Sequence, residues 1–182
     1  LFCSDHNIIF DNVILDNSEA GYSCGIFLVT SSNSILRYNN ITSEIYPPNF
    51  DGITVNISSC DNVIVANNIS FTRRGLDIGD FHAERNAIYH NNFRKNELQA
   101  LSIGRGTIWN LTYPYGCGNY WSDQDHGPCA DHYSGPDQNI PDPDGDKVVD
   151  TPYIIGYDDV DYLPLMIQWP YILSDMNDDG IV

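Results

Sequence analysis

A short acidic loop towards the end of the sequence has the composition of a calcium site. Asp142, Asp144, Asp146 and Asp150 lie close together around Gly145. Calcium prefers carboxylate oxygens, and carboxylates this close repel one another unless a cation lies between them. We therefore predict that these four residues bind Ca²⁺. The alternative is a solvated acidic turn, because Gly145 falls earlier than in the loop pattern that wraps calcium.

A second acidic segment places oxygen ligands at alternate positions. Asp175, Asn177 and Asp179 are followed by Gly180, which matches the opening of the pattern D-x-[DN]-x-[DN]-G. The sequence stops before the carboxylate that would close such a loop, so we expect only weak calcium binding here. Residues 174–182 are accordingly interpreted as a linker and a truncated calcium loop.

Basic residues are few and concentrated. The chain has 8 Lys and Arg against 25 Asp and Glu, and the pairs Arg73–Arg74 and Arg94–Lys95 each precede a predicted strand. Guanidinium groups bind carboxylate and sulfate through two parallel hydrogen bonds. One hypothesis is that the four side chains form a stripe that binds an acidic polysaccharide or an acidic neighbouring surface. The other is that they compensate nearby carboxylates.

Asp80, His82 and Arg85 lie in one predicted turn and offer the groups of a polysaccharide lyase or uronate epimerase. Such an enzyme needs a base, an acid and a group that neutralises the uronate carboxylate. Polar residues are also common in turns, and no second motif supports catalysis. We keep the three residues as weak catalytic candidates and prefer a non-catalytic role.

Five cysteines and four Asn-x-Ser/Thr sequons favour an oxidising, extracellular setting. Cys117 and Cys129 are the best disulfide candidates because they bracket a short segment, whereas Cys3, Cys24 and Cys60 have no assigned partner. The four sequons begin at Asn40, Asn56, Asn68 and Asn110. Asn56 and Asn110 are the better glycosylation candidates, since Asn40 and Asn68 belong to the repeat described next.

The net charge of -17 argues against nucleic-acid binding, because the surface repels phosphate. No apolar run is long enough to span a membrane. The sequence opens inside a repeat and ends within a motif, so we expect it to be part of a longer protein. The oligomeric state is left open.

An internal repeat decides the predicted fold. Four segments of common pattern begin 27, 28 and 24 residues apart, at residues 7–14, 34–41, 62–69 and 86–93. Their third place is aliphatic and their sixth is asparagine, namely Asn12, Asn39, Asn67 and Asn91. A second short strand follows in each repeat, at residues 25–28, 52–55, 75–78 and 100–103.

Units this small cannot bury a core alone and must stack on their neighbours. Stacking superimposes the aliphatic positions and lets the asparagine amides bond from coil to coil. The pattern predicts an all-β fold, a right-handed parallel β-helix of about four coils over residues 1–106. Residues 107–173 are rich in Trp, Tyr, Pro and Gly and predict an irregular aromatic-rich C-terminal cap over the open end of the stack. An aromatic sugar-binding platform is the alternative interpretation of this segment.

Three cap motifs, at residues 118–123, 150–155 and 161–166, follow the asparagine-rich coils in that order. In this the chain resembles the NosD-like β-helix repeat proteins of archaeal surfaces over roughly residues 7–170. The segment at 175–180 resembles the start of a dockerin-type or EF-hand module. The resemblance implies a secreted surface module, sometimes tied to carbohydrate. The family name also implies copper, but the five histidines are scattered and form no cluster with Met or Cys.

These observations favour a non-catalytic structural or adhesive module of a cell-surface glycoprotein that binds acidic carbohydrate. Its expected cofactor is Ca²⁺, and its expected partner is an acidic polysaccharide or a neighbouring envelope protein. The alternative is a lyase or epimerase that acts on acidic polysaccharide.

Overall fold

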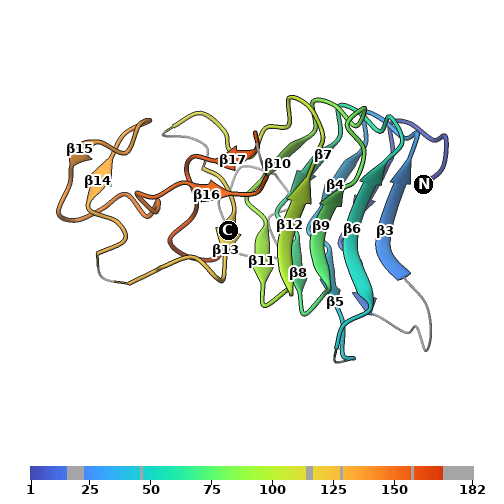
Figure 1. Cartoon of the computed structure of the whole chain (residues 1–182), viewed down its shortest axis with the longest axis horizontal. Helices are drawn as coiled ribbons and strands as arrows, with labels where there is room; N and C mark the ends of the chain where they lie inside the picture. The colour runs from blue at the N-terminus through green and yellow to red at the C-terminus, as the bar shows by residue number, and fades with distance from the viewer. Residues whose placement is uncertain (16–22, 46, 114–116, 128, 157, 170–182) are drawn as a thin grey trace.

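The structure, a computed structural model, describes residues 1–15, 23–45, 47–113, 117–127, 129–156 and 158–169. Asp175, Asn177 and Asp179 of the predicted truncated calcium loop lie outside these residues. In the described part every regular element is a β-strand, and no helix is long and apolar enough to cross a membrane. Short parallel strands stack along the long axis of the molecule (Figure 1).

Three parallel sheets form the walls of the stack; each of four coils supplies one strand to each wall, and the second sheet has one strand more. The first sheet contains β1 (Ile8–Phe10), β4 (Ile35–Arg37), β7 (Val63–Val65) and β10 (Ala87–Tyr89). The second contains β2 (Val13–Leu15), β5 (Asn40–Thr42), β8 (Asn68–Ser70), β11 (Asn92–Arg94) and β13 (Tyr120–Trp121). The third contains β3 (Ser23–Val29), β6 (Phe50–Asn56), β9 (Arg74–Ile78) and β12 (Leu98–Ser102). The predicted parallel β-helix of about four coils is confirmed.

The core is built from columns of equivalent residues. In the first sheet Ile9, Leu36, Ile64 and Ile88 are in register. In the second, Ile14, Ile41, Ile69, Phe93 and Trp121 are in register, and the last four of these are fully buried. Because parallel strands stack about 4.8 Å apart, each buried side chain packs on the one below it. Alternation of inward and outward side chains therefore leaves each wall with one apolar face.

Asparagine side chains bond along the turn between the first and second sheets. The Nδ2 atoms of Asn12, Asn39, Asn67 and Asn91 each donate to the Oδ1 of the equivalent residue one coil on, at 2.9–3.0 Å. The last acceptor is Asn119, which the repeat pattern had not included. Each of the four donor asparagines follows a non-glycine residue with positive φ, for example Ala66 before Asn67. The coil-to-coil bonds thus hold a turn whose backbone is otherwise unfavourable.

The stack continues beyond residue 106, where the coils were expected to end. Ile108 bridges to Ala87, and β13 pairs with β11 in the same register as the preceding coils. Beyond it lie two antiparallel pairs, β14 (Tyr133–Ser134) with β15 (Ile140–Pro141) and β16 (Tyr153–Ile154) with β17 (Val160–Asp161). The pair β14–β15 lies at the end of the molecule farthest from the N-terminal coil (Figure 1).

Candidate functional site

Asp161 joins the cap to the coils. Its carboxylate is fully buried and accepts hydrogen bonds from the backbone N–H of Asn119 at 2.7 Å and from Nε1 of Trp121 at 3.0 Å. Burial raises the pKa of Asp161 to about 7, although these donors favour the ionised form. A side chain at Gly118 would collide with this carboxylate, which explains the glycine of the first cap motif. The asparagine ladder therefore ends on a carboxylate supplied by the third cap motif.

The second cap motif completes the same junction. The Tyr153 ring stacks on Trp121 with centroids 4.2 Å apart, and Trp121 stacks on Phe93 at 4.6 Å. The Tyr153 hydroxyl donates to Asp123 at 3.0 Å. The aromatic residues of this junction thus extend a core column, which is the role expected of a cap.

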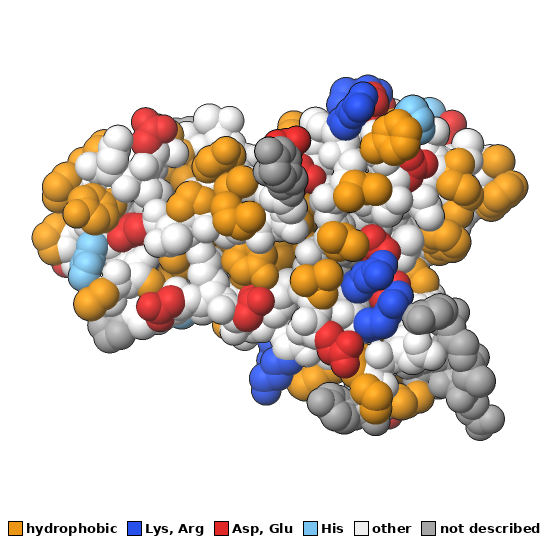
Figure 2. All heavy atoms as spheres, viewed as in Figure 1, with side chains coloured by type: hydrophobic (Ala, Val, Ile, Leu, Met, Phe, Trp, Pro, Cys, Tyr) orange, Lys and Arg blue, Asp and Glu red, His pale blue; other side chains and the backbone are white. Residues whose placement is uncertain are grey.

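Arg73 and Arg74 of the predicted basic stripe are bound to carboxylates of the third sheet. Arg73 donates to both oxygens of Asp51, from Nε at 3.0 Å and from Nη2 at 2.6 Å. Arg74 pairs with Asp77. Basic and acidic side chains lie side by side over this sheet in Figure 2. Charge compensation accounts for these two residues.

Arg94 and Lys95 have a different environment. Neither has a carboxylate within ion-pair distance among the described residues. Arg94 is in register with Ser70 of the preceding coil, so Lys95 follows in the position of Phe71. Its Nζ lies 5.5 Å from the centroid of the Phe71 ring. Arg94 therefore ends β11, and Lys95 begins the turn between the second and third sheets.

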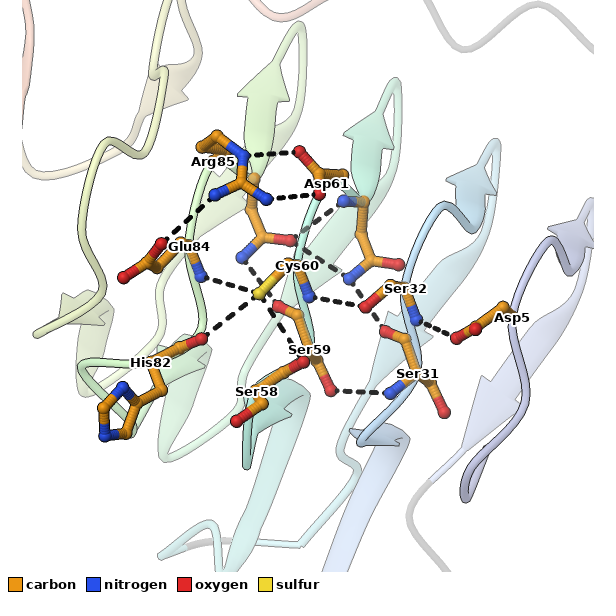
Figure 3. Close-up of polar contacts among 12 residues, drawn as sticks. Asp5, Ser31, Ser32, Ser58, Ser59, Cys60, Asp61, His82, Glu84 and Arg85 are labelled. Atoms are coloured by element: carbon orange, nitrogen blue, oxygen red, sulfur yellow. Dashed lines mark hydrogen bonds and ion pairs between the residues drawn. The ribbon is translucent and has the colours of Figure 1, made fainter.

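The structure does not assemble Asp80, His82 and Arg85 into a catalytic group. Arg85 donates to both oxygens of Asp61 in the preceding coil, at 2.8 and 2.7 Å, and these bonds lower the pKa of Asp61. Asp80 accepts the backbone N–H groups of His82 and Ser58. Figure 3 shows the His82 ring directed away from the Arg85–Asp61 pair. The arrangement holds adjacent turns together.

The same turn contains the thiol of Cys60. Its Sγ lies 3.2 Å from the carbonyl oxygen of His82 and accepts the backbone N–H of Glu84 at 3.4 Å (Figure 3). Ser32 Oγ accepts the N–H of Cys60, and Asp5 accepts the N–H of Ser32. Side chains thus link the turns of successive coils along this edge.

In the predicted calcium loop, the aspartates bind backbone groups. Asp142 accepts the N–H of Asp144, and Asp146 accepts that of Val148. Asp150 accepts the N–H groups of His132 and Tyr133, at 2.8 and 3.1 Å. Calcium binding by Asp142, Asp144, Asp146 and Asp150 stays a prediction.

The proposed disulfide between Cys117 and Cys129 is not formed, and all five cysteines are free. Cys117 leads into β13 and packs beside His90, while Cys129 is exposed in the segment that leads to β14. The short separation in sequence suggested the bond. Burial raises the pKa of the Cys117 thiol to about 11, so it is protonated at neutral pH.

Among the sequons, Asn40 and Asn68 are in register on the outer face of the second sheet, and Asn68 Nδ2 donates to Asn40 Oδ1 at 2.8 Å. Asn56 accepts the N–H of Ile57, and Asn110 accepts that of Tyr162. All four are partly exposed. Glycosylation at these residues stays a prediction.

The five histidines are spread along the sequence, at residues 6, 82, 90, 126 and 132. The described residues contain no group of three or more His, Cys, Asp or Glu side chains that could hold a metal ion. The His90 ring stacks on Trp169 with centroids 3.5 Å apart, and its Nε2 accepts the N–H of Cys117 at 3.4 Å. Burial lowers the pKa of His90 to about 4. His90 is thus a packing residue of the cap junction.

The comparison with protein families gives one match. The family described as periplasmic copper-binding protein (NosD) matches residues 1–126, which covers the coils and the start of the cap. No curated protein and no solved structure matches the chain significantly. The copper in the family's description finds no ligand set in the described residues, whereas its periplasmic location agrees with the expected place outside the cytoplasm. On the matched segment and the β-helix it forms, the chain belongs to the NosD family.

Proposed function

We propose that the chain is a non-catalytic, extracellular structural or adhesive module that binds acidic carbohydrate through Arg94 and Lys95, where β11 ends and the next turn begins. The observation behind the proposal is the contrast among its cations. Arg73, Arg74 and Arg85 are engaged by carboxylates, whereas Arg94 and Lys95 have no carboxylate partner among the described residues. On a chain of net charge -17, two adjacent cations without a carboxylate partner are available to an anionic partner.

The β-helix supports this role physically. Its coils are held by backbone ladders and by asparagine side chains, so the turns are rigid positions for surface groups. A rigid surface loses little conformational entropy when it binds a polymer. Because Arg94 and Lys95 are exposed or half-exposed, their attraction for a polyanion is screened by salt. The expected binding is therefore weak and salt-sensitive.

The experiment is affinity electrophoresis through gels that contain alginate, polygalacturonate or a sulfated polysaccharide. We expect at least one acidic polymer to retard the protein, and Arg94→Gln/Lys95→Met to abolish most of that retardation. Arg105→Gln/Lys147→Met is the matched control, because it removes the same charge from residues elsewhere with no carboxylate partner among the described residues. Equal loss in both variants, or no retardation by any polymer, would contradict the proposal.

The enzymatic alternative is tested with the same polymers. We expect no unsaturated product and no epimerised sugar after incubation, because Arg85 is bound to Asp61 and the His82 ring points away from it. Activity that disappears in His82→Ala would replace the binding module by a lyase or epimerase.

A further inference from the structure

The loop at residues 43–49 is longer than the turns that follow it along the stack. It joins β5 to β6, whereas residues 71–73 join β8 to β9 and residues 95–97 join β11 to β12. The shorter turns stack in register. The described residues of the longer loop, 43–45 and 47–49, project beyond them at the lower edge of the solenoid (Figure 1). A step in the surface results, between the loop and the next two turns.

A hollow of about 150 Å³ occupies this step. Its lining includes Glu44 and Ile45 from the loop, Phe71 from the first short turn, and Lys95 and Glu97 from the second. Phe71 is 46% exposed and Ile45 is 44% exposed, so the hollow has an apolar floor that faces solvent. Charged groups of both signs surround that floor.

Phe71 and Lys95 occupy equivalent positions in adjacent coils, and both have positive φ. Both side chains are exposed, and the Lys95 ammonium lies 5.5 Å from the centroid of the Phe71 ring. No carboxylate lies within ion-pair distance of Lys95 among the described residues, although Glu44 and Glu97 line the same hollow. The Lys95 ammonium can therefore pair with an anionic group of a ligand that packs on the Phe71 ring.

We propose that this hollow binds one hexuronate residue of an acidic polysaccharide. The inference rests on the proposed function and locates its binding subsite. A hexuronate combines an apolar ring face, several hydroxyl groups and one carboxylate, and each has a counterpart here. The ring packs on Phe71 and Ile45, the hydroxyls donate to Glu44 and Glu97, and the carboxylate pairs with Lys95. The hollow takes one ring, and its open side lets the polymer continue in both directions.

The test is calorimetric titration of the whole chain with trigalacturonate and with triguluronate. We expect one of the trimers to bind, and Phe71→Ala and Lys95→Met each to weaken that binding about tenfold. Phe81→Ala and Lys147→Met are the controls and should bind as the unchanged protein does. Phe81 is 48% exposed on another turn, so its removal matches that of Phe71 in size and exposure.

Methyl esterification of the trimer identifies the contact made by Lys95. The ester should bind the unchanged protein about tenfold more weakly, yet bind Lys95→Met no more weakly than the acid does, since the two changes remove the same interaction. Additive losses would exclude the Lys95–carboxylate contact. Trimer binding that Phe71→Ala and Lys95→Met leave unchanged would place the subsite elsewhere.

Two further outcomes separate this inference from the proposed function. If neither trimer binds but an acidic polymer still retards the protein, the hexuronate subsite is wrong and the binding module stands. If neither the trimers nor any polymer interacts, the proposed function itself fails.

Discussion

Asp161 is a buried carboxyl group surrounded by hydrogen-bond donors, and no cation lies within ion-pair distance of it among the described residues. Four N–H groups point at its carboxylate, from the backbone and side chain of Asn119, the indole of Trp121 and the backbone of Leu163. These bonds replace part of the lost hydration, but burial still raises its pKa to about 7. The folded protein therefore holds a proton on Asp161 at pH values where the unfolded chain has already released it.

The consequence is a stability that falls as pH rises. Between the unfolded pKa of 3.8 and the folded pKa of about 7, the native state binds more protons, so ionisation of Asp161 costs stability. We expect the difference in unfolding free energy between the protein and Asp161→Asn to change across this window by up to about 1.4 kcal/mol per pH unit. Urea unfolding at half-unit steps from pH 4.5 to pH 8 measures it.

The contribution of His90 to stability changes with pH in the opposite direction and must be separated from that of Asp161. Its pKa is lowered to about 4, so the unfolded chain takes up a proton first and stability falls as pH drops below 6.5. A His90→Gln background removes this contribution. If the effect of Asp161→Asn in that background is the same at every pH, Asp161 does not titrate in the window.

At the scale of the element, the turn between the first and second sheets determines coil stacking. Three successive ladder residues, Asn39, Asn67 and Asn91, are fully buried. Asn67 accepts from the backbone N–H and Nδ2 of Asn39, and donates to Asn91 and to the carbonyl oxygens of Leu36 and Val65. One amide therefore satisfies polar groups of three coils.

Replacing Asn67 by alanine should destabilise the fold by about 3 kcal/mol, because several buried partners lose their hydrogen bonds at once. Asn139→Ala is the control, since Asn139 is exposed in the cap. Chemical denaturation of both variants, with the slope checked for two-state behaviour, gives the comparison. Equal midpoints for the two variants would mean that the ladder contributes nothing to stability.

At the scale of the whole molecule, the aspartates in the distal part of the cap contribute to the negative charge of the chain. Residues 131–150 carry aspartates whose carboxylates bind backbone N–H groups across the loop: Asp131 holds Asp146 and Lys147, and Asp150 holds His132 and Tyr133. The chain as a whole has a net charge of -17, so both a bound cation and general screening would oppose its self-repulsion.

The predicted Ca²⁺ site is tested by separating these two effects. We expect calcium to raise the melting temperature, and a chelator to reverse the rise, beyond what NaCl produces at equal ionic strength. Saturation a hundredfold above Kd corresponds to about 2.7 kcal/mol. Asp142→Asn/Asp144→Asn should remove the effect, and Asp137→Asn, an exposed aspartate of the same region, should keep it. Identical responses to calcium and NaCl would leave the loop without a cation site.

The sequence by itself determined the coils. An asparagine at a constant offset and aliphatic residues at constant places specify a stacked repeat, because burial and amide bonding recur only if equivalent positions superimpose. The ladder through Asn12, Asn39, Asn67 and Asn91 was therefore predictable. Asn119 lies 28 residues after Asn91, within the spacing of the repeat, but the pattern did not include it because Gly116 stands at the aliphatic third place.

Only the tertiary structure decided the state of the charged and sulfur groups. Arg73 and Arg94 look alike in sequence. Asp51 in the preceding coil pairs with Arg73, whereas Arg94 has no carboxylate partner among the described residues. Cys117 and Cys129 are close in sequence, yet both are free. Such pairings depend on which side chains the stacking brings together, and the partner of Arg73 comes from the preceding coil. The repeat therefore specifies the scaffold, and the contacts between its irregular turns specify the site.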